Sequence, residues 1–140
     1  IQGRVELLCD YVARAQRDGR PLREDPVIRA RIAQLLTETE VARVLGFSFV
    51  AKSMKGGAAP TVEASEYKLY ATQLSQRVAN ASLDIGGPAA QLRVGEADAP
   101  MNGRADTSYR CTGVEASGGG ASGSQESIIA RRKLGLPRNF

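Results

Sequence analysis

Glycine and proline clusters divide the chain into long segments, and this division limits the fold more than any other feature of the sequence. Breaks fall at Gly19 and in residues 56–60, 86–88 and 118–120. Paired glycines and prolines resist helix formation, whereas the segments before residue 86 and after residue 121 repeat apolar residues every three or four positions. Such spacing gives a helix an apolar face that a neighbouring helix must cover. We therefore predict an all-α protein, built as an antiparallel four-helix bundle.

The four helices are expected at about residues 2–18, 25–55, 61–85 and 122–134. The second begins with Asp25 as its cap and Pro26 at its first position, both typical of a helix start. Its inward face is expected to hold four aliphatic residues, Ile28, Ile32, Leu35 and Leu36. Residues 86–121 are polar and turn-rich without a sustained period, so we expect a long loop there.

A glycine-rich turn leads directly into the last predicted helix. Gly120 and Gly123 leave this backbone free of Cβ atoms, so that a ligand could approach the positive helix end closely. Ser122 and Gln125 have the spacing of a capping box, in which each side chain pairs with a backbone N–H at the helix start. We therefore predict that Ser122 caps this helix.

The composition excludes several classes of protein. The chain has 140 residues, a net charge of +4, two cysteines and no histidine. These residues make neither a disulfide framework nor a metal site, and a His-based catalytic triad cannot form. Basic residues are interleaved with acidic ones, which indicates a solvated surface and no nucleic-acid interface. No apolar run is long enough for a membrane span and no signal-peptide pattern is present, so we expect a cytoplasmic protein.

Several short motifs follow one another along the chain. They are Glu-Ala-Ser with Lys-Leu-Tyr at 63–70, Gly-Gly at 86–87, Tyr-Arg at 109–110, the glycine turn, Ile-Ile-Ala at 128–130 and Leu-Gly-Leu-Pro-Arg at 134–138. In this order they resemble the C-terminal helical domain of acyl-CoA dehydrogenases, and the likeness extends over nearly the whole chain. The resemblance implies that residues 1–140 are the C-terminal helical domain of a longer chain, and that this fragment alone is inactive.

The resemblance also implies the chemistry. Members of this family oxidise an acyl-CoA thioester to the 2,3-enoyl-CoA: a glutamate removes the α-proton, FAD accepts the β-hydride, and electrons pass to an electron-transfer flavoprotein. It further implies a homo- or hetero-oligomer, a dimer or tetramer, in which each flavin is bound across a subunit boundary. In many members the glutamate immediately precedes the Gly-Thr of the turn, and that position here is Gly119. Because glycine cannot act as a base, we predict no catalytic residue there.

The cofactor positions implied by the resemblance are partly altered. Ala15 takes the place of an arginine that holds the FAD pyrophosphate, Arg17 takes the place of a hydroxyl residue, and Leu83 replaces a glutamine near the adenine. Arg17, or Arg14 one turn earlier, could still meet a phosphate. The predicted cofactor-binding residues are Arg14, Arg17, Gly86, Gly87, Gly120, Ala121, Ser122 and Gly123.

These departures leave three hypotheses. The chain belongs to a catalytic acyl-CoA dehydrogenase whose base lies elsewhere, or to a degenerate, non-catalytic partner subunit of a hetero-oligomeric enzyme, or it is an unrelated helical scaffold. Glu115 precedes Gly119 by one helical turn, but a structural or surface role is the simpler interpretation of it. Glu63 and Glu66 are explained by the dipole of the helix that they begin.

Overall fold

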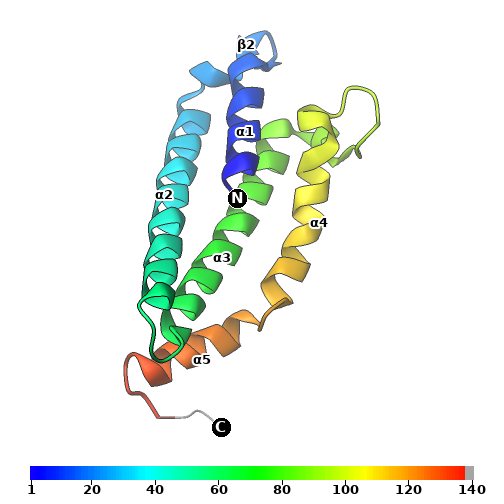
Figure 1. The fold of residues 1–140 in the computed structure, drawn as a ribbon. Coiled ribbons are helices and arrows are strands. Elements are labelled where there is room, and N and C mark those ends of the chain that lie inside the picture. Colours follow the sequence, from blue (N-terminus) through cyan, green and yellow to red (C-terminus); the bar gives the residue numbers. More distant parts are fainter. Residues whose placement is uncertain (138–140) are drawn as a thin grey trace.

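Four helices run side by side, alternately up and down, and a fifth crosses one end of them (Figure 1). The computed structural model describes residues 1–137. Its helices are α1 (Gln2–Arg14), α2 (Pro26–Met54), α3 (Thr61–Gly86), α4 (Arg104–Ser117) and the crossing helix α5 (Ser122–Arg132). The all-α prediction is confirmed, but the described residues form five α-helices instead of four. Within this part of the chain, no helix combines the length and apolar character needed to cross a membrane.

The first helix is shorter than predicted, because a small hairpin takes its expected last turn. Helix α1 ends at Arg14, and β1 (Gln16–Arg17) pairs antiparallel with β2 (Arg20–Pro21). The connecting residues Asp18 and Gly19 have φ of 51° and 74°. Positive φ at both central positions is what a two-residue type I′ hairpin requires, and Asp-Gly is a preferred pair for it. This local preference outweighs continuation of the helix.

The predicted loop over residues 86–121 is wrong. It contains the short 3-10 helices η2 (Pro88–Gln91) and η3 (Pro100–Gly103), followed by α4. The buried residues of α4 are Ala105, Asp106 and Thr112, so its inward face is small and polar and shows no aliphatic stripe. Packing against α3 stabilises α4 although its sequence lacks the usual apolar period.

Helix α2 begins as predicted. The Asp25 side chain accepts hydrogen bonds from the backbone N–H groups of Val27 (2.8 Å) and Ile28 (3.3 Å). Ile28 and Leu35 are buried, but Leu36, which we expected to face inward, is 46% exposed. Successive helical residues are turned by about 100°, so a neighbour of the inward Leu35 points sideways.

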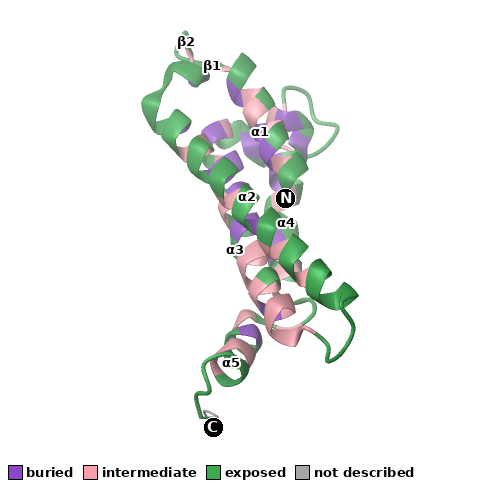
Figure 2. Cartoon of the chain, turned by 60° about the vertical axis from the view of Figure 1, so that its left-hand side comes forward, coloured by how far each residue is buried: buried purple, intermediate pink, exposed green. Residues whose placement is uncertain are grey.

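The core lies at one end of the bundle. Residues 1–40 and 73–117, here named the hairpin half, contain the large buried aliphatic side chains, among them Leu8, Leu74 and Val78. Residues 41–72 and 118–137, here named the glycine-turn half, bury only Ala42, Ser65 and Gln125 among the described residues. Figure 2 shows the same division, with most buried positions gathered around α1 and few near α5. Arg138, the last residue of the terminal motif, lies outside the described residues.

Candidate functional site

The predicted cofactor-binding residues form two groups at opposite ends of α3. Arg17 donates a hydrogen bond to the carbonyl oxygen of Ile85 (2.7 Å), which places the hairpin at the last turn of α3. A Cβ added at Gly119 would lie 3.7 Å from Lys68 Cε, near the first turns of the same helix. The helical rise of 1.5 Å per residue separates Lys68 from Ile85 by roughly 25 Å. The two groups therefore lie far apart, since the hairpin is at one end of the bundle and α5 is at the other (Figure 1).

At the hairpin end, the two predicted arginines lie in different surroundings. Arg17 lines a pocket of about 810 Å³ together with Asp18, Arg20 and Glu24. Its bond to Ile85 uses one of the five N–H groups that a guanidinium offers. Arg14 donates to the backbone oxygen of Asp10 on its own helix (3.0 Å). Arg17 is thus the arginine that the fold brings to the end of α3.

The two glycines at the end of α3 have different roles. A Cβ at Gly86 would lie 2.7 Å from Ala90 Cβ and 3.2 Å from Met101 Cε, so glycine is needed there for packing. Gly87 has φ of 71°, and nothing lies within 4 Å of the position of its missing Cβ. The Gly87 backbone is therefore open to close approach, as a cofactor site requires.

A pocket of about 620 Å³ lies beside Gly87, between the end of α3 and α4. Its lining includes four residues that the sequence did not indicate as part of a site: Asp84, Asp106, Tyr109 and Arg110. Arg110 Nε donates to Asp106 Oδ1 (2.9 Å) and Oδ2 (3.0 Å), and this pairing raises the pKa of Arg110. Their spacing of four residues is a helical ion-pair signal. The polar, aperiodic sequence around Asp106 and Arg110 predicts a loop, in which this spacing has no such meaning.

At the other end, the glycine turn differs from the predicted capping box. Ala121 is the residue that precedes α5, and the helix start has no side-chain cap, so the prediction of Ser122 as the cap is wrong. Gln125, which is buried, instead donates from Nε2 to the carbonyl oxygen of Gly119 (3.0 Å). A Cβ at Gly120 would lie 2.7 Å from Gln125 Nε2. Gln125 therefore folds over the turn, a role that we did not predict for it.

The start of α5 keeps its hydrogen-bond donors free of side-chain partners. Ser122 is the first helical residue, and Gly123 follows it with open space beside its Cα. The first N–H groups of a helix have no partner within the helix and lie at its positive end. An anionic or carbonyl group fits these donors, and the open space beside Gly123 allows close approach, whereas Gln125 fills the space beside Gly120.

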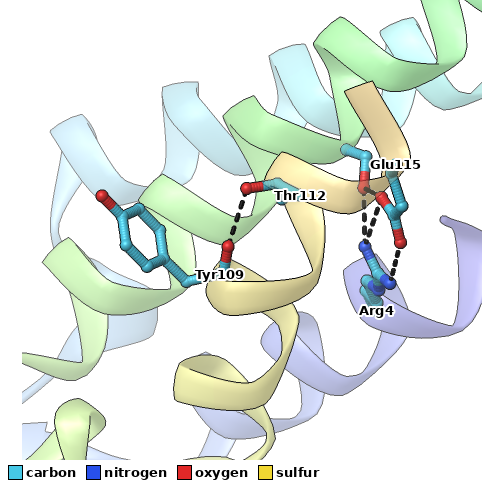
Figure 3. A network of polar contacts seen from close by, with 5 residues as sticks. Arg4, Tyr109, Thr112 and Glu115 are labelled. Carbon is cyan, nitrogen blue, oxygen red and sulfur yellow. Dashed lines mark hydrogen bonds and ion pairs between the residues drawn. The ribbon is translucent and has the colours of Figure 1, made fainter. Parts of the chain in front are cut away.

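Glu115 belongs to a polar network that joins α1, α3 and α4 (Figure 3). Arg4 Nη2 pairs with Glu115 Oε1 (2.5 Å), and Arg4 Nη1 donates to Ser75 Oγ (2.6 Å), whose hydroxyl donates to Glu115 Oε2. Lys68 Nζ donates to the backbone oxygen of Glu115 (2.6 Å). The hydrogen bond from Arg4 lowers the pKa of Glu115 and outweighs partial burial, which acts in the opposite direction. This carboxylate is held as an ion-pair partner and has a structural role.

The usual glutamate position has no side chain to supply a base. Gly119 has φ of 72°, a conformation that residues with a Cβ rarely adopt. The two glutamates at the start of α3 are also engaged, since Glu63 pairs with Lys52 and Glu66 with Lys133. The hydrogen bond from Lys52 lowers the pKa of Glu63. Neither these glutamates nor Glu115 is a free carboxylate at the turn.

Comparison with known proteins identifies the family. Residues 1–134 match the family described as acyl-CoA dehydrogenase, C-terminal domain, and the chain belongs to this family. The acyl-CoA dehydrogenase FadE26 of Mycobacterium tuberculosis is 28% identical over 124 residues, which cover 86% of this chain and 30% of the relative.

Several solved structures share the fold. The ChsE4-ChsE5 complex from Mycobacterium tuberculosis matches with a TM-score of 0.87 at 24% identity, over 99% of this chain and 36% of that one. The Tcur3481-Tcur3483 steroid ACAD matches with a TM-score of 0.83 at 26% identity, over 97% of this chain and 35% of that one. The chain therefore spans about a third of the length of these relatives.

Proposed function

We propose that this chain is the C-terminal helical domain of a flavin-dependent acyl-CoA dehydrogenase, and that it binds FAD with two separate surfaces. The enzyme oxidises an acyl-CoA thioester to the 2,3-enoyl-CoA and passes electrons to an electron-transfer flavoprotein. The observation that supports this proposal is that the residues matching the family's cofactor positions lie at opposite ends of α3. Two ends suit two flavins, each shared with another subunit, and this arrangement requires a dimer or tetramer.

The hairpin end has the chemistry to hold the diphosphate part of one FAD. Arg17 offers guanidinium N–H groups, which form strong charge-assisted hydrogen bonds with phosphate oxygens. Gly87 leaves the backbone beside the 620 Å³ pocket uncovered. Arg17 would bind the phosphate, and Gly87 would let the rest of the dinucleotide approach α3.

The glycine turn has the chemistry to orient a second FAD. The uncapped start of α5 supplies backbone donors at Ser122 and Gly123, and Ser122 also has a hydroxyl that is not used as a cap. When bound, the flavin supplies the hydride acceptor for the β-carbon of the acyl group. Ala121 adds little side-chain bulk and the space beside Gly123 is open, so the flavin would approach there and not at Gly120, which Gln125 covers.

The proton acceptor for the α-carbon is not at the usual position. We infer that another part of the protein supplies it, because Gly119 has no side chain and Glu115 is committed to Arg4 and Ser75. A second candidate function is that of a non-catalytic partner subunit. It is favoured by the glycine at position 119, and by the similarity to the ChsE4-ChsE5 and Tcur3481-Tcur3483 structures, each named for two chains.

Flavin content tests the proposed cofactor. We expect the complete protein, purified alone or with its partner, to show flavin absorption. Arg17→Gln should weaken FAD binding by about tenfold or more, because it removes a charged phosphate ligand. Arg29→Gln, on the exposed surface of α2, is the matched control and should leave FAD binding unchanged. A colourless protein that gains no flavin absorption when FAD is added would contradict the proposal.

Turnover of an acyl-CoA distinguishes the two candidate functions. If the base lies elsewhere in a catalytic protein, Gly119→Glu should not raise turnover, because two carboxylates in one site disfavour each other's ionisation. If the subunit lacks a base, the same change should create activity. Gly119→Ala controls for the backbone strain that any side chain causes at φ of 72°. Activity gained by the glutamate variant but not by the alanine variant would establish the partner-subunit function.

A further inference from the structure

Gln125 is the buried residue of α5, although its side chain is polar. It is only 7% exposed. A buried amide group normally has a hydrogen-bond partner, and the partner of Gln125 Nε2 is the carbonyl oxygen of Gly119, at 3.0 Å. This bond joins the first turn of α5 to the glycine turn that precedes the helix.

The backbone of the glycine turn is held by little else. Within residues 1–137, Gly119 and Gly120 form no hydrogen bond other than the one from Gln125. The last backbone bond before them joins the N–H of Gly118 to the carbonyl oxygen of Val114 (2.8 Å), at the end of α4. Three consecutive glycines can adopt many conformations, because no Cβ restricts them. The Gln125 amide therefore selects one conformation of the turn.

The far end of α5 is attached independently of this bond. Lys133 pairs with Glu66, and Arg132 donates to Thr61 Oγ1 (2.5 Å), so both contacts hold the C-terminal end of α5 against the start of α3. The opposite end of α5 carries the backbone donors that we assign to the flavin. At that end, Gln125 is the side chain that ties the helix to the turn.

We propose that Gln125 is a positioning residue for the flavin. Its amide holds the glycine turn in the conformation that places the donors of Ser122 and Gly123 beside the cofactor. This inference rests on the proposed flavin role of the α5 start. A ligand that binds one conformation of a segment loses affinity in proportion to the fraction of molecules that adopt it. Fixing the turn before the cofactor binds therefore raises the affinity.

The two glycines of the turn differ in their relation to Gln125. A Cβ at Gly120 would lie 2.7 Å from Gln125 Nε2, so a side chain at this position would displace the amide. A Cβ at Gly119 would meet Lys68 Cε at 3.7 Å, which is an ordinary contact. Both glycines have positive φ, of 72° at Gly119 and 104° at Gly120. Replacing each by alanine therefore separates backbone strain from displacement of Gln125.

Removal of the amide in the complete protein tests the proposal. Gln125→Met keeps an unbranched side chain and removes the hydrogen-bond donor. We expect the dissociation constant for FAD to rise by about fivefold or more, and the visible circular dichroism of the bound flavin to change. The melting temperature without flavin should stay close to that of the parent. Gln73→Met, the same substitution at an exposed position of α3, is the matched control and should leave FAD binding unchanged.

The contrary results distinguish this proposal from the flavin role itself. If Gln125→Met melts at a lower temperature but binds FAD with the affinity and dichroism of the parent, Gln125 only stabilises the fold and the proposal is wrong. If the melting temperature and FAD binding are both unchanged, the proposal is also wrong, while the flavin role stands. If the parent itself binds no FAD, the flavin role fails and this proposal fails with it.

A double-mutant cycle tests the position of Gln125 without flavin. Gly120→Ala should lower the melting temperature of the complete protein, and should lower it less in a Gln125→Ala background, where no amide is displaced. Gly119→Ala brings similar backbone strain without reaching Gln125, so it should have the same effect in both backgrounds. Equal effects of Gly120→Ala in the two backgrounds would show that Gln125 does not lie over the turn, and would overturn the proposal.

Discussion

The hairpin half and the glycine-turn half are stabilised in different ways. In the hairpin half, Leu8, Leu74 and Val78 are fully buried and come from two helices that meet face to face. In the glycine-turn half, Phe47 and Met54 are exposed and the buried residues are small or polar. The hairpin half therefore has its own hydrophobic core. The glycine-turn half is held together by polar contacts, and its large apolar side chains remain exposed within the described residues.

The polar contacts of the glycine-turn half join α2 and α5 to the start of α3. Lys52 pairs with Glu63 and Lys133 with Glu66, while Arg132 donates to Thr61 Oγ1 (2.5 Å). Exposed ion pairs contribute about 0–1 kcal/mol each, much less than a buried leucine. The glycine-turn half is therefore helical but only weakly stabilised. This difference in stabilisation indicates that the glycine-turn half opens more readily than the hairpin half.

The largest expected difference between the halves comes from removing a leucine side chain. Leu74→Ala should lower the free energy of unfolding by about 2–5 kcal/mol, because it leaves a cavity at a fully buried position. Leu134→Ala, at a position that is 64% exposed in the glycine-turn half, should change it by less than about 0.5 kcal/mol. Urea denaturation followed by circular dichroism measures both. Equal losses would show that the halves do not differ in packing.

Two glycines sharpen the comparison. Gly86→Ala should destabilise the protein by about 1–3 kcal/mol, since the added methyl would lie 2.7 Å from Ala90 Cβ. Gly123→Ala should instead gain up to about 1 kcal/mol, because the helical backbone there has open space around it. Melting temperatures of the two variants test this. A loss of stability in Gly123→Ala would show that the glycine-turn half is packed more tightly than we infer.

The sequence predicts those helices best whose ends and faces are marked by local chemistry. Asp25 and Pro26 mark the start of α2, and paired glycines mark the end of α3. Helix α4 was not predictable from periodicity, because Asp106 and Thr112 replace the aliphatic residues expected on an inward face. The hairpin was predictable from Asp18-Gly19, but the apolar stripe of the first helix was extended across it.

The candidate site was predictable only residue by residue. The resemblance indicated Arg17, Gly87 and Ser122, but their separation along α3 depends on the folded chain. The role of Gln125 also required the structure, since its side chain bonds to Gly119 instead of completing a capping box. The spacing of residues along the sequence indicates which contacts are possible, and the packing of the folded chain determines which of them form.

The starts of α2 and α5 provide a further comparison of the two halves, with a smaller expected effect. Asp25→Ala should cost about 1 kcal/mol of stability, because it removes the acceptor for two backbone N–H groups of α2. Ser122→Ala should cost less than about 0.5 kcal/mol, since Ser122 does not cap α5. If the alanine at 122 is as destabilising as the alanine at 25, the capping interpretation that we reject is correct. Flavin affinity of Ser122→Ala, measured in parallel, tests its hydroxyl as a cofactor contact.

The smallest expected effect concerns Glu115, which lies where the two halves meet. Glu115→Gln should cost about 0.5–1 kcal/mol at neutral pH, because the charge of the partly exposed ion pair with Arg4 is lost while the amide oxygen still accepts one hydrogen bond from Arg4. The hydrogen bond from Arg4 lowers the pKa of Glu115 in the folded protein. Its contribution is therefore fully present above the unfolded-state pKa of about 4.3, and is lost as the pH falls through the lower folded value. The stability difference between the parent and Glu115→Gln should thus be constant near neutrality and shrink in acid.

Denaturation curves from pH 7 to pH 3 measure this stability difference, with Glu126→Gln at an exposed position of α5 as the control. A difference that grows as the pH falls would mean that Glu115 is protonated in the folded protein, and its assignment as a structural ion pair would then be wrong.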